Sequence, residues 1–183
     1  MVGAKRSVVT SAVLTMTLAS ATVTRAAGPW KGHADLSGYQ ENLTLSSPAT
    51  GTFDLKISKD GNSVEYTLRY EGLATNVLFA HIHLGRPAIN GGIMVFLCTN
   101  GTPPAGAPLP PACPQGGGTV TGVLEAADVI GPSGQGVSAN EFSEFIQALR
   151  AEAAYANVHT MAFGGGEIRG QITFSREDTI NDD

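Results

Sequence analysis

The chain has 183 residues, 16 of them acidic and 11 basic, and its formal net charge is −5 at pH 7. An acidic chain without a basic stripe does not fit a protein that binds nucleic acid or docks on anionic membranes. If residues 1–27 were removed, 156 residues would remain (183 minus 27), which suits one domain with a hydrophobic core. Three basic and no acidic residues would be lost with them, so the charge would become −8.

Residues 1–27 are typical of a secretory signal peptide. Basic residues at Lys5 and Arg6 precede an apolar and small-residue run, and the small residues Ala26 and Ala27 offer a cleavage point. The run is too rich in Thr, Ser and Ala to span a bilayer well, and no second hydrophobic segment follows. We therefore expect an exported protein, periplasmic or secreted, with no membrane span in the mature chain.

Alternating apolar and polar residues predict an antiparallel sheet. Apolar side chains alternate with polar ones over residues 52–58 and again over residues 64–70, and the turn sequence Lys59-Asp-Gly-Asn62 separates the two runs. Further strands are expected over residues 77–84, 93–97, 118–124, 158–163 and 167–174. The 23 glycines and 10 prolines suit the many tight connections that short strands need.

Three histidines form the candidate metal site. His81 and His83 lie two residues apart in an apolar strand, so their side chains share one face of the sheet. His159 lies in a later strand that the fold could bring against them. Two or three imidazoles could hold a copper or zinc ion, because both metals accept neutral imidazole. The alternative is that the three rings are buried and bind backbone groups.

Cys98 and Cys113 enclose a segment rich in Gly and Pro. In an oxidising compartment an even number of cysteines around one flexible loop predicts a disulfide. A thiolate metal pair or a redox couple is the alternative, but the spacing matches no common zinc or CxxC pattern.

One helix is expected over residues 139–152. The sequence Ser138-Ala-Asn-Glu141 is a capping-box pattern, and Phe142, Phe145, Ile146 and Leu149 follow at helical spacing. The stripe predicts a helix that packs against one face or end of the sheet rather than one that binds a partner.

Glu167 and Arg169 share one face of the last expected strand. Such a pair could contact a ligand, or each residue could form an ion pair with a neighbouring strand. The sequence contains no nucleophile elbow, phosphate-binding glycine loop or His-Glu-x-x-His helix. An enzyme is therefore the less favoured class.

Several motifs resemble the chordin-type (CHRD) domain. They are His81-Ile-His-Leu-Gly85, Asn90-Gly-Gly92, Tyr155-Ala-Asn-Val-His-Thr160 and Gly166-Glu-Ile-Arg-Gly-Gln171, in the order that the family has them. The resemblance implies an extracytoplasmic β-rich module, of a kind that is repeated in chordin, an extracellular protein that sequesters growth factors. It supplies no settled activity for single-domain members. The His-x-His strand is also similar to the copper ligands of copper–zinc superoxide dismutase, but four histidines are too few for that enzyme's site.

Together these observations predict a mainly β fold: a single antiparallel β-sandwich or flattened barrel, immunoglobulin-like or superoxide-dismutase-like, with one packing helix. The expected organisation is a signal peptide at 1–27, an N-terminal segment at 28–35, a CHRD-like domain at 36–174 and an acidic tail at 175–183. Two functions remain open. One is an exported binding or scaffold module for an extracytoplasmic protein, and the other is a copper- or zinc-binding protein, either a carrier or a small metalloenzyme.

Overall fold

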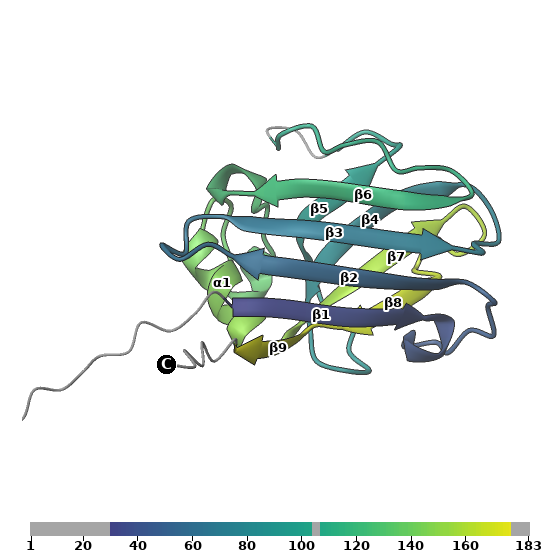
Figure 1. Cartoon of the computed structure of the whole chain (residues 1–183), viewed down its shortest axis with the longest axis horizontal. Coiled ribbons are helices and arrows are strands. Elements are labelled where there is room, and N and C mark those ends of the chain that lie inside the picture. The colour runs from purple at the N-terminus through teal and green to yellow at the C-terminus, as the bar shows by residue number, and fades with distance from the viewer. Residues whose placement is uncertain (1–29, 104–106, 177–183) are drawn as a thin grey trace, which may run out of the picture.

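The computed structural model describes residues 30–103 and 107–176 (Figure 1). The expected signal peptide at 1–27 and most of the expected tail, residues 177–183, lie outside the described residues. The strands are β1 Trp30–Ser37, β2 Thr50–Ile57, β3 Val64–Glu71, β4 Val77–Leu84, β5 Ile93–Thr99, β6 Gly117–Leu124, β7 Ala154–Thr160, β8 Ile168–Gln171 and β9 Thr173–Arg176. The helix is α1 Phe142–Arg150, and three short 3-10 turns are η1 Gly38–Gln40, η2 Ala126–Asp128 and η3 Ser133–Gln135.

These strands form one antiparallel sheet that folds into two layers. The strand order is β5-β4-β7-β8-β1-β2-β3-β6, and β9 also pairs with β1. In Figure 1 the strands β6, β3, β2 and β1 form the front layer, and β5, β4 and β7 cross behind them. The layers are joined where Ser37 of β1 pairs with Arg169 of β8. The mainly β fold predicted from the sequence, a sandwich or flattened barrel with one helix, is confirmed.

The opposite edges of the sheet nearly close the barrel. The end strands β5 and β6 share no ladder in the described part of the chain, but side chains connect their surroundings. The hydroxyl of Tyr66 donates to the carbonyl of Leu97 at 2.6 Å, and the predicted Cys98–Cys113 disulfide joins β5 to the segment before β6. The bridge is confirmed; its sequence separation is 15 residues, and a loop of this length contributes about 3 kcal/mol in the chain-entropy model.

The predicted hairpin is formed by β2 and β3, whose register runs from Ile57 opposite Val64 to Thr50 opposite Glu71. Gly61 in its turn has a φ of 74°, which glycine adopts without strain. The apolar side chains of both strands point into the core between the layers. The buried set is Phe53, Leu55, Ile57, Val64, Tyr66, Leu68 and Tyr70.

Strand β1 was not among the expected strands, and the sheet therefore begins before Leu36. The side chains that β1 turns inward are small, because Gly32 and Ala34 precede Leu36, so the apolar alternation is weak in the sequence. A Cβ at Gly32 would lie 3.0 Å from Leu55 Cγ, which shows how closely this strand packs.

Two expected strands have different bounds in the structure. The expected strand at 158–163 is β7 and begins at Ala154; all seven of its side chains are buried, so no polar face marked its start. The expected strand at 167–174 divides at Ile172 into β8, which pairs with β7 and at one position with β1, and β9, which pairs with β1.

The helix is shorter than expected at both ends. The carboxylate of Glu141 accepts the backbone N–H of Ser138 at 2.6 Å, which is one half of the expected capping box. Asn140, however, has a φ of 67°, a left-handed conformation that a helix interior does not accept, so α1 begins only at Phe142. The helix lies at one end of the two layers (Figure 1) and buries the predicted apolar stripe there.

Among the described residues, no helix is both long enough and apolar enough to cross a bilayer.

Phe145→Ala should lower the free energy of unfolding by about 3–5 kcal/mol, because the ring is fully buried and its loss leaves a cavity. Ser143→Ala, on the exposed side of the same helix, should change it by less than about 0.5 kcal/mol. Urea unfolding of both variants measures the difference. Equal stabilities would show that the stripe does not support the fold.

Candidate functional site

The three histidines lie on the face of β4 and β7 that points away from the core between the layers. Ala80 and Ile82 of β4 point into that core, so His81 and His83 occupy the opposite face. In β7 the same alternation places His159 on that face, opposite Phe79 of β4 in the strand register. The sequence predicted the shared face of His81 and His83, and the pairing of β4 with β7 brings His159 beside them.

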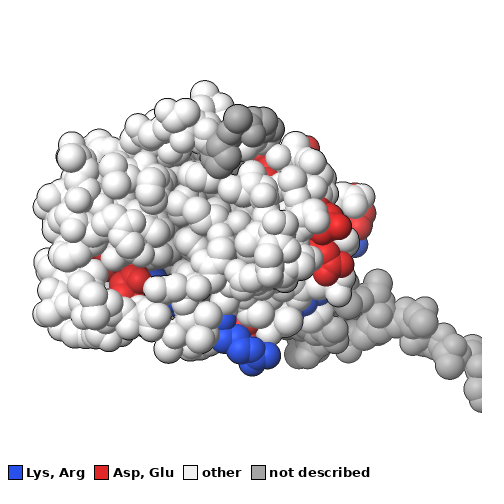
Figure 2. Space-filling view, turned by 180° about the vertical axis from the view of Figure 1, so that it is seen from behind, with Lys and Arg blue, Asp and Glu red and all other residues white. Residues whose placement is uncertain are grey.

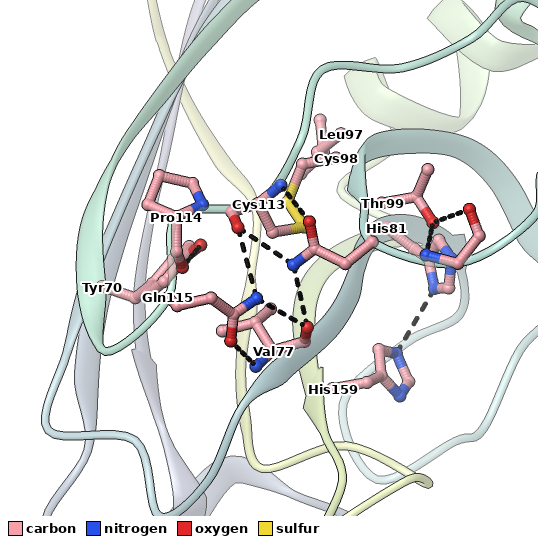
Figure 3. Close-up of a disulfide and its surroundings, with 12 residues drawn as sticks. Tyr70, Val77, His81, Leu97, Cys98, Thr99, Cys113, Pro114, Gln115 and His159 are labelled. Carbon is pink, nitrogen blue, oxygen red and sulfur yellow. Dashed lines mark hydrogen bonds between the residues drawn. A yellow bond between two sulfur atoms is a disulfide. The ribbon is translucent and has the colours of Figure 1, made fainter.

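The three imidazoles form one compact cluster. Their ring centres are 5.0 Å apart for His81 and His159, 5.4 Å for His81 and His83, and 5.8 Å for His83 and His159. Nδ1 of His81 lies 3.4 Å from Nε2 of His159, the contact drawn in Figure 3. One nitrogen from each ring falls within 4.8 Å of the other two. Within residues 30–103 and 107–176, no other set of three such side chains is grouped closely enough to hold a metal ion.

Two loops fix the orientation of the rings. Nδ1 of His83 lies 3.0 Å from the carbonyl of Gly91, and Nδ1 of His159 lies 3.0 Å from the carbonyl of Gly164. A carbonyl only accepts, so in His83 and His159 Nδ1 carries the proton and Nε2 carries the lone pair. Nε2 of His159 then accepts from Nδ1 of His81, which leaves the lone pair of His81 on its Nε2.

Within residues 30–103 and 107–176, the buried Nε2 atoms of His81 and His83 have no hydrogen-bond partner. Leaving a buried polar atom unpaired costs about 1–3 kcal/mol, and such atoms are uncommon in native proteins.

The glycine at position 91 allows the loop to reach this site, since a Cβ there would lie 1.6 Å from the carbonyl oxygen of Leu84. Only a glycine lets the loop pass this close to the end of β4.

Aromatic rings surround the cluster. Phe79 stacks on His81 with ring centres 4.7 Å apart, and Phe96 of β5 meets the same ring edge-on at 4.2 Å. Tyr155 stacks parallel to His83 at 4.8 Å. The three imidazoles are therefore buried among aromatic rings, and water has little access to them.

The register of β5 against β4 shifts twice beside the cluster. Ala80 pairs with Cys98 but His81 with Phe96, so Leu97 is skipped, and a second shift follows Ile82. Such bulges bend a strand and redirect its side chains, and they are enriched next to functional sites. Here they keep Phe96 on the histidine side of the sheet.

Burial is the main cause that lowers the pKa of His81 to about 2, and the neighbouring rings of His159 and His83 lower it further. Burial also lowers the pKa values of His83 and His159 to about 4, against the opposing effect of the hydrogen bonds to Gly91 and Gly164. All three imidazoles are therefore neutral at pH 7, which is the protonation state of a metal ligand.

Arg169 is buried on the same side of the sheet. Its guanidinium carbon lies 3.5 Å from the centre of the Tyr155 ring, so Arg169, Tyr155 and His83 form a stack. The guanidinium donates to the carbonyls of Ile89 and Arg86 at 2.9 and 3.2 Å. Arg169 thus holds the loop whose Gly91 carbonyl binds His83.

Glu167 does not share this position. It lies at the end of the layers, where its carboxylate accepts hydrogen bonds from the hydroxyls of Ser47 and Thr160 and from the backbone of Ala74, at 2.7 to 2.9 Å. In the part of the chain that the structure describes, no ion pair joins Glu167 to Arg169, and neither residue forms an ion pair with another strand. Both side chains hold loops in place instead.

Sequence reasoning missed a buried carboxyl near the site. Glu41 accepts a hydrogen bond from the side-chain amide of Asn157 at 2.7 Å. Burial raises the pKa of Glu41, and the Asn157 hydrogen bond and the charge of Arg169 oppose that shift. The strand alternation could have placed Asn157 beside His159, but no pattern linked Glu41, which is 116 residues away, to this face.

The surface over the back layer is mostly uncharged, with acidic and basic atoms confined to a few places (Figure 2). The arrangement beneath it consists of three neutral, buried nitrogen donors lined by aromatic rings. It can bind a soft or borderline cation, and it offers no nucleophile next to a general base.

The fold and this site define a small disulfide-bridged β-sandwich module with an internal histidine cluster. The chain belongs to the CHRD domain family, whose model matches residues 33–172. The match includes all three histidines and covers most of the chain, so the family predicted from the sequence is confirmed. No curated protein and no solved structure matches the chain.

The metal-free protein should lose stability as the pH falls below about 6.5. The unfolded chain then protonates its histidines while the folded chain keeps three neutral, which costs about 1.4 kcal/mol per pH unit for each ring until its folded pKa is reached. The hydrogen bond to Asp54 raises the pKa of the exposed His33, so this residue stabilises the folded chain as the pH falls. Its effect is smaller than the combined loss from the three buried histidines. Urea unfolding at pH 7.5, 6 and 5 measures the trend, and equal stabilities would contradict it.

Proposed function

We propose that this protein is an exported CHRD module with a binding or scaffold role, and that its fold encloses one copper or zinc ion held by His81, His83 and His159. Family membership supports the binding or scaffold role. The burial of the three rings, each 7% exposed or less, supports an ion held permanently. A carrier or a metalloenzyme would need an open coordination position, as catalytic zinc sites have.

One observation carries the metal proposal: donor nitrogens of three buried imidazoles converge, and Nε2 of His83 has no partner among the described residues. Histidines that serve only to pack the core would have their ring nitrogens satisfied by protein groups. The backbone contacts of His83 and His159 have the form of the outer contacts that orient metal-binding histidines, in which the second ring nitrogen donates to a carbonyl.

The distances suit a single ion after a small adjustment. Ligands that bind one ion at about 2 Å lie about 3.3 Å from each other, and Nδ1 of His81 is already 3.4 Å from Nε2 of His159. The ligand atoms all lie within 4.8 Å of one another, so the rings would have to approach by at most about 1.5 Å. His81 would then transfer its proton from Nδ1 to Nε2 and stay neutral.

The proposed export rests on residues 1–27 and on the compartment that a disulfide needs. The bridge between Cys98 and Cys113 is buried, and it would form in the periplasm or outside the cell. Cleavage after Ala27 would leave two residues before β1, so the whole described sheet would be retained.

His81→Phe should abolish the uptake of one copper or zinc ion per chain. The variant keeps an aromatic ring against Phe79 and Phe96 and removes both ring nitrogens, at a cost to folding of about 1–3 kcal/mol from the larger ring. Metal content after dialysis, with circular dichroism as the check on folding, measures the effect.

The matched control is His33→Phe, the same change at a half-exposed histidine on the front layer. It should leave the uptake unchanged. A wild-type chain that takes up no metal, or a His81→Phe variant that takes up as much as the wild type, would contradict the proposed site.

Expression of the full chain should yield an exported protein that begins at Gly28. Intact-mass measurement of the exported fraction, with and without reductant, gives the cleavage position and shows whether the bridge is present. Protein that retains residues 1–27 and stays with the cytoplasmic fraction would contradict the proposed export.

A further inference from the structure

We infer that the ion held by the histidine cluster is monovalent copper, Cu(I), rather than zinc. This inference rests on the metal site proposed above and adds the identity of the ion. It follows from the charge, the number of donors and the surroundings of the cluster.

The donor set brings no negative charge. The group of potential ligands within 4.8 Å consists of the three histidines alone, and both cysteines of the chain are tied in the disulfide. The charge of the ion therefore stays uncompensated in a buried place. The cost of taking an ion out of water rises with the square of its charge, so Zn²⁺ costs about four times as much as a monovalent ion of the same size.

A fixed positive charge lies close by. The guanidinium of Arg169 covers one face of Tyr155, whose ring stacks on His83. The buried carboxyl of Glu41 accepts a hydrogen bond from Asn157 and is not part of the ligand group. Arg169 therefore opposes a divalent ion at the cluster twice as strongly as a monovalent one.

The number of donors points to the same ion. Zinc in structural sites takes four ligands in a tetrahedron, and this closed cluster offers three. Cu(I) has a filled d shell and is stable with three nitrogen ligands in a plane. Phe79 and Phe96 lie against His81, and Tyr155 lies against His83. Aromatic rings favour a nearby cation through their π faces.

The test offers each ion to the full chain with its disulfide intact. Cu(I), kept reduced with ascorbate under anaerobic conditions, is supplied from a coloured Cu(I) chelator, and Zn²⁺ from a coloured zinc chelator of matched strength. We expect one Cu(I) per chain to transfer to the protein and Zn²⁺ to remain on its chelator. X-ray absorption at the copper edge should then show three nitrogen ligands and no sulfur.

The variants test the choice of ion and the existence of the site separately. His81→Phe should lose the Cu(I) and His33→Phe should keep it. Transfer of one Zn²⁺ per chain in place of Cu(I), lost in His81→Phe, would overturn the choice of copper and leave the site standing. Transfer of neither ion to the wild-type chain would overturn the site itself, and so would Cu(I) bound equally by His81→Phe. The absorption spectrum of the wild type decides the ligand set even if a variant fails to fold.

Discussion

All seven side chains of β7 are buried, so water reaches neither face of this strand. One face adjoins the hydrophobic core, and the other carries Tyr155, Asn157 and His159. Each polar group on that second face needs a partner inside the protein, because an unpaired buried group is costly. The partners come from the loops on this side: the backbone N–H of Gly91 donates to the Tyr155 hydroxyl, the Glu41 carboxylate accepts from Asn157, and the carbonyl of Gly164 accepts from His159.

Most of the front layer was predictable because one of its faces is in water, and β1, whose inward side chains are small, was the exception. In the hairpin of β2 and β3 polar side chains alternate with apolar ones, and the sequence indicates both strands and the turn between them. The back layer lacks this contrast, so the start of β7 at Ala154 could not be read from the pattern. The helix began late for a local reason, the left-handed backbone of Asn140, that no capping pattern reveals.

The candidate site was predictable in part. The spacing of His81 and His83 places them on one face, because strands alternate with a period of two. The register that sets Phe79 against His159 depends on strand pairing across a long stretch of sequence, which spacing cannot give. Arg169 was a candidate from the sequence, but its hydrogen bonds to the loop at Arg86 and Ile89, at least 80 residues away, were beyond prediction for the same reason. The carbonyls of Gly91 and Gly164 lie near His83 and His159 in the chain, but loop conformation rather than strand spacing aims them at the rings.

The pairing of β1 has a consequence for the order in which the molecule forms. Trp30 pairs with Arg176 and His33 with Thr173, so the first strand of the described chain needs the last one beside it. Because the chain is synthesised from its N-terminus, β1 is exposed long before β9 exists. Contacts between such distant segments form slowly because of the entropy of loop closure. Until β9 is made, this edge of β1 stays open. Folding of the sheet is thus completed only after the chain has been synthesised through β9.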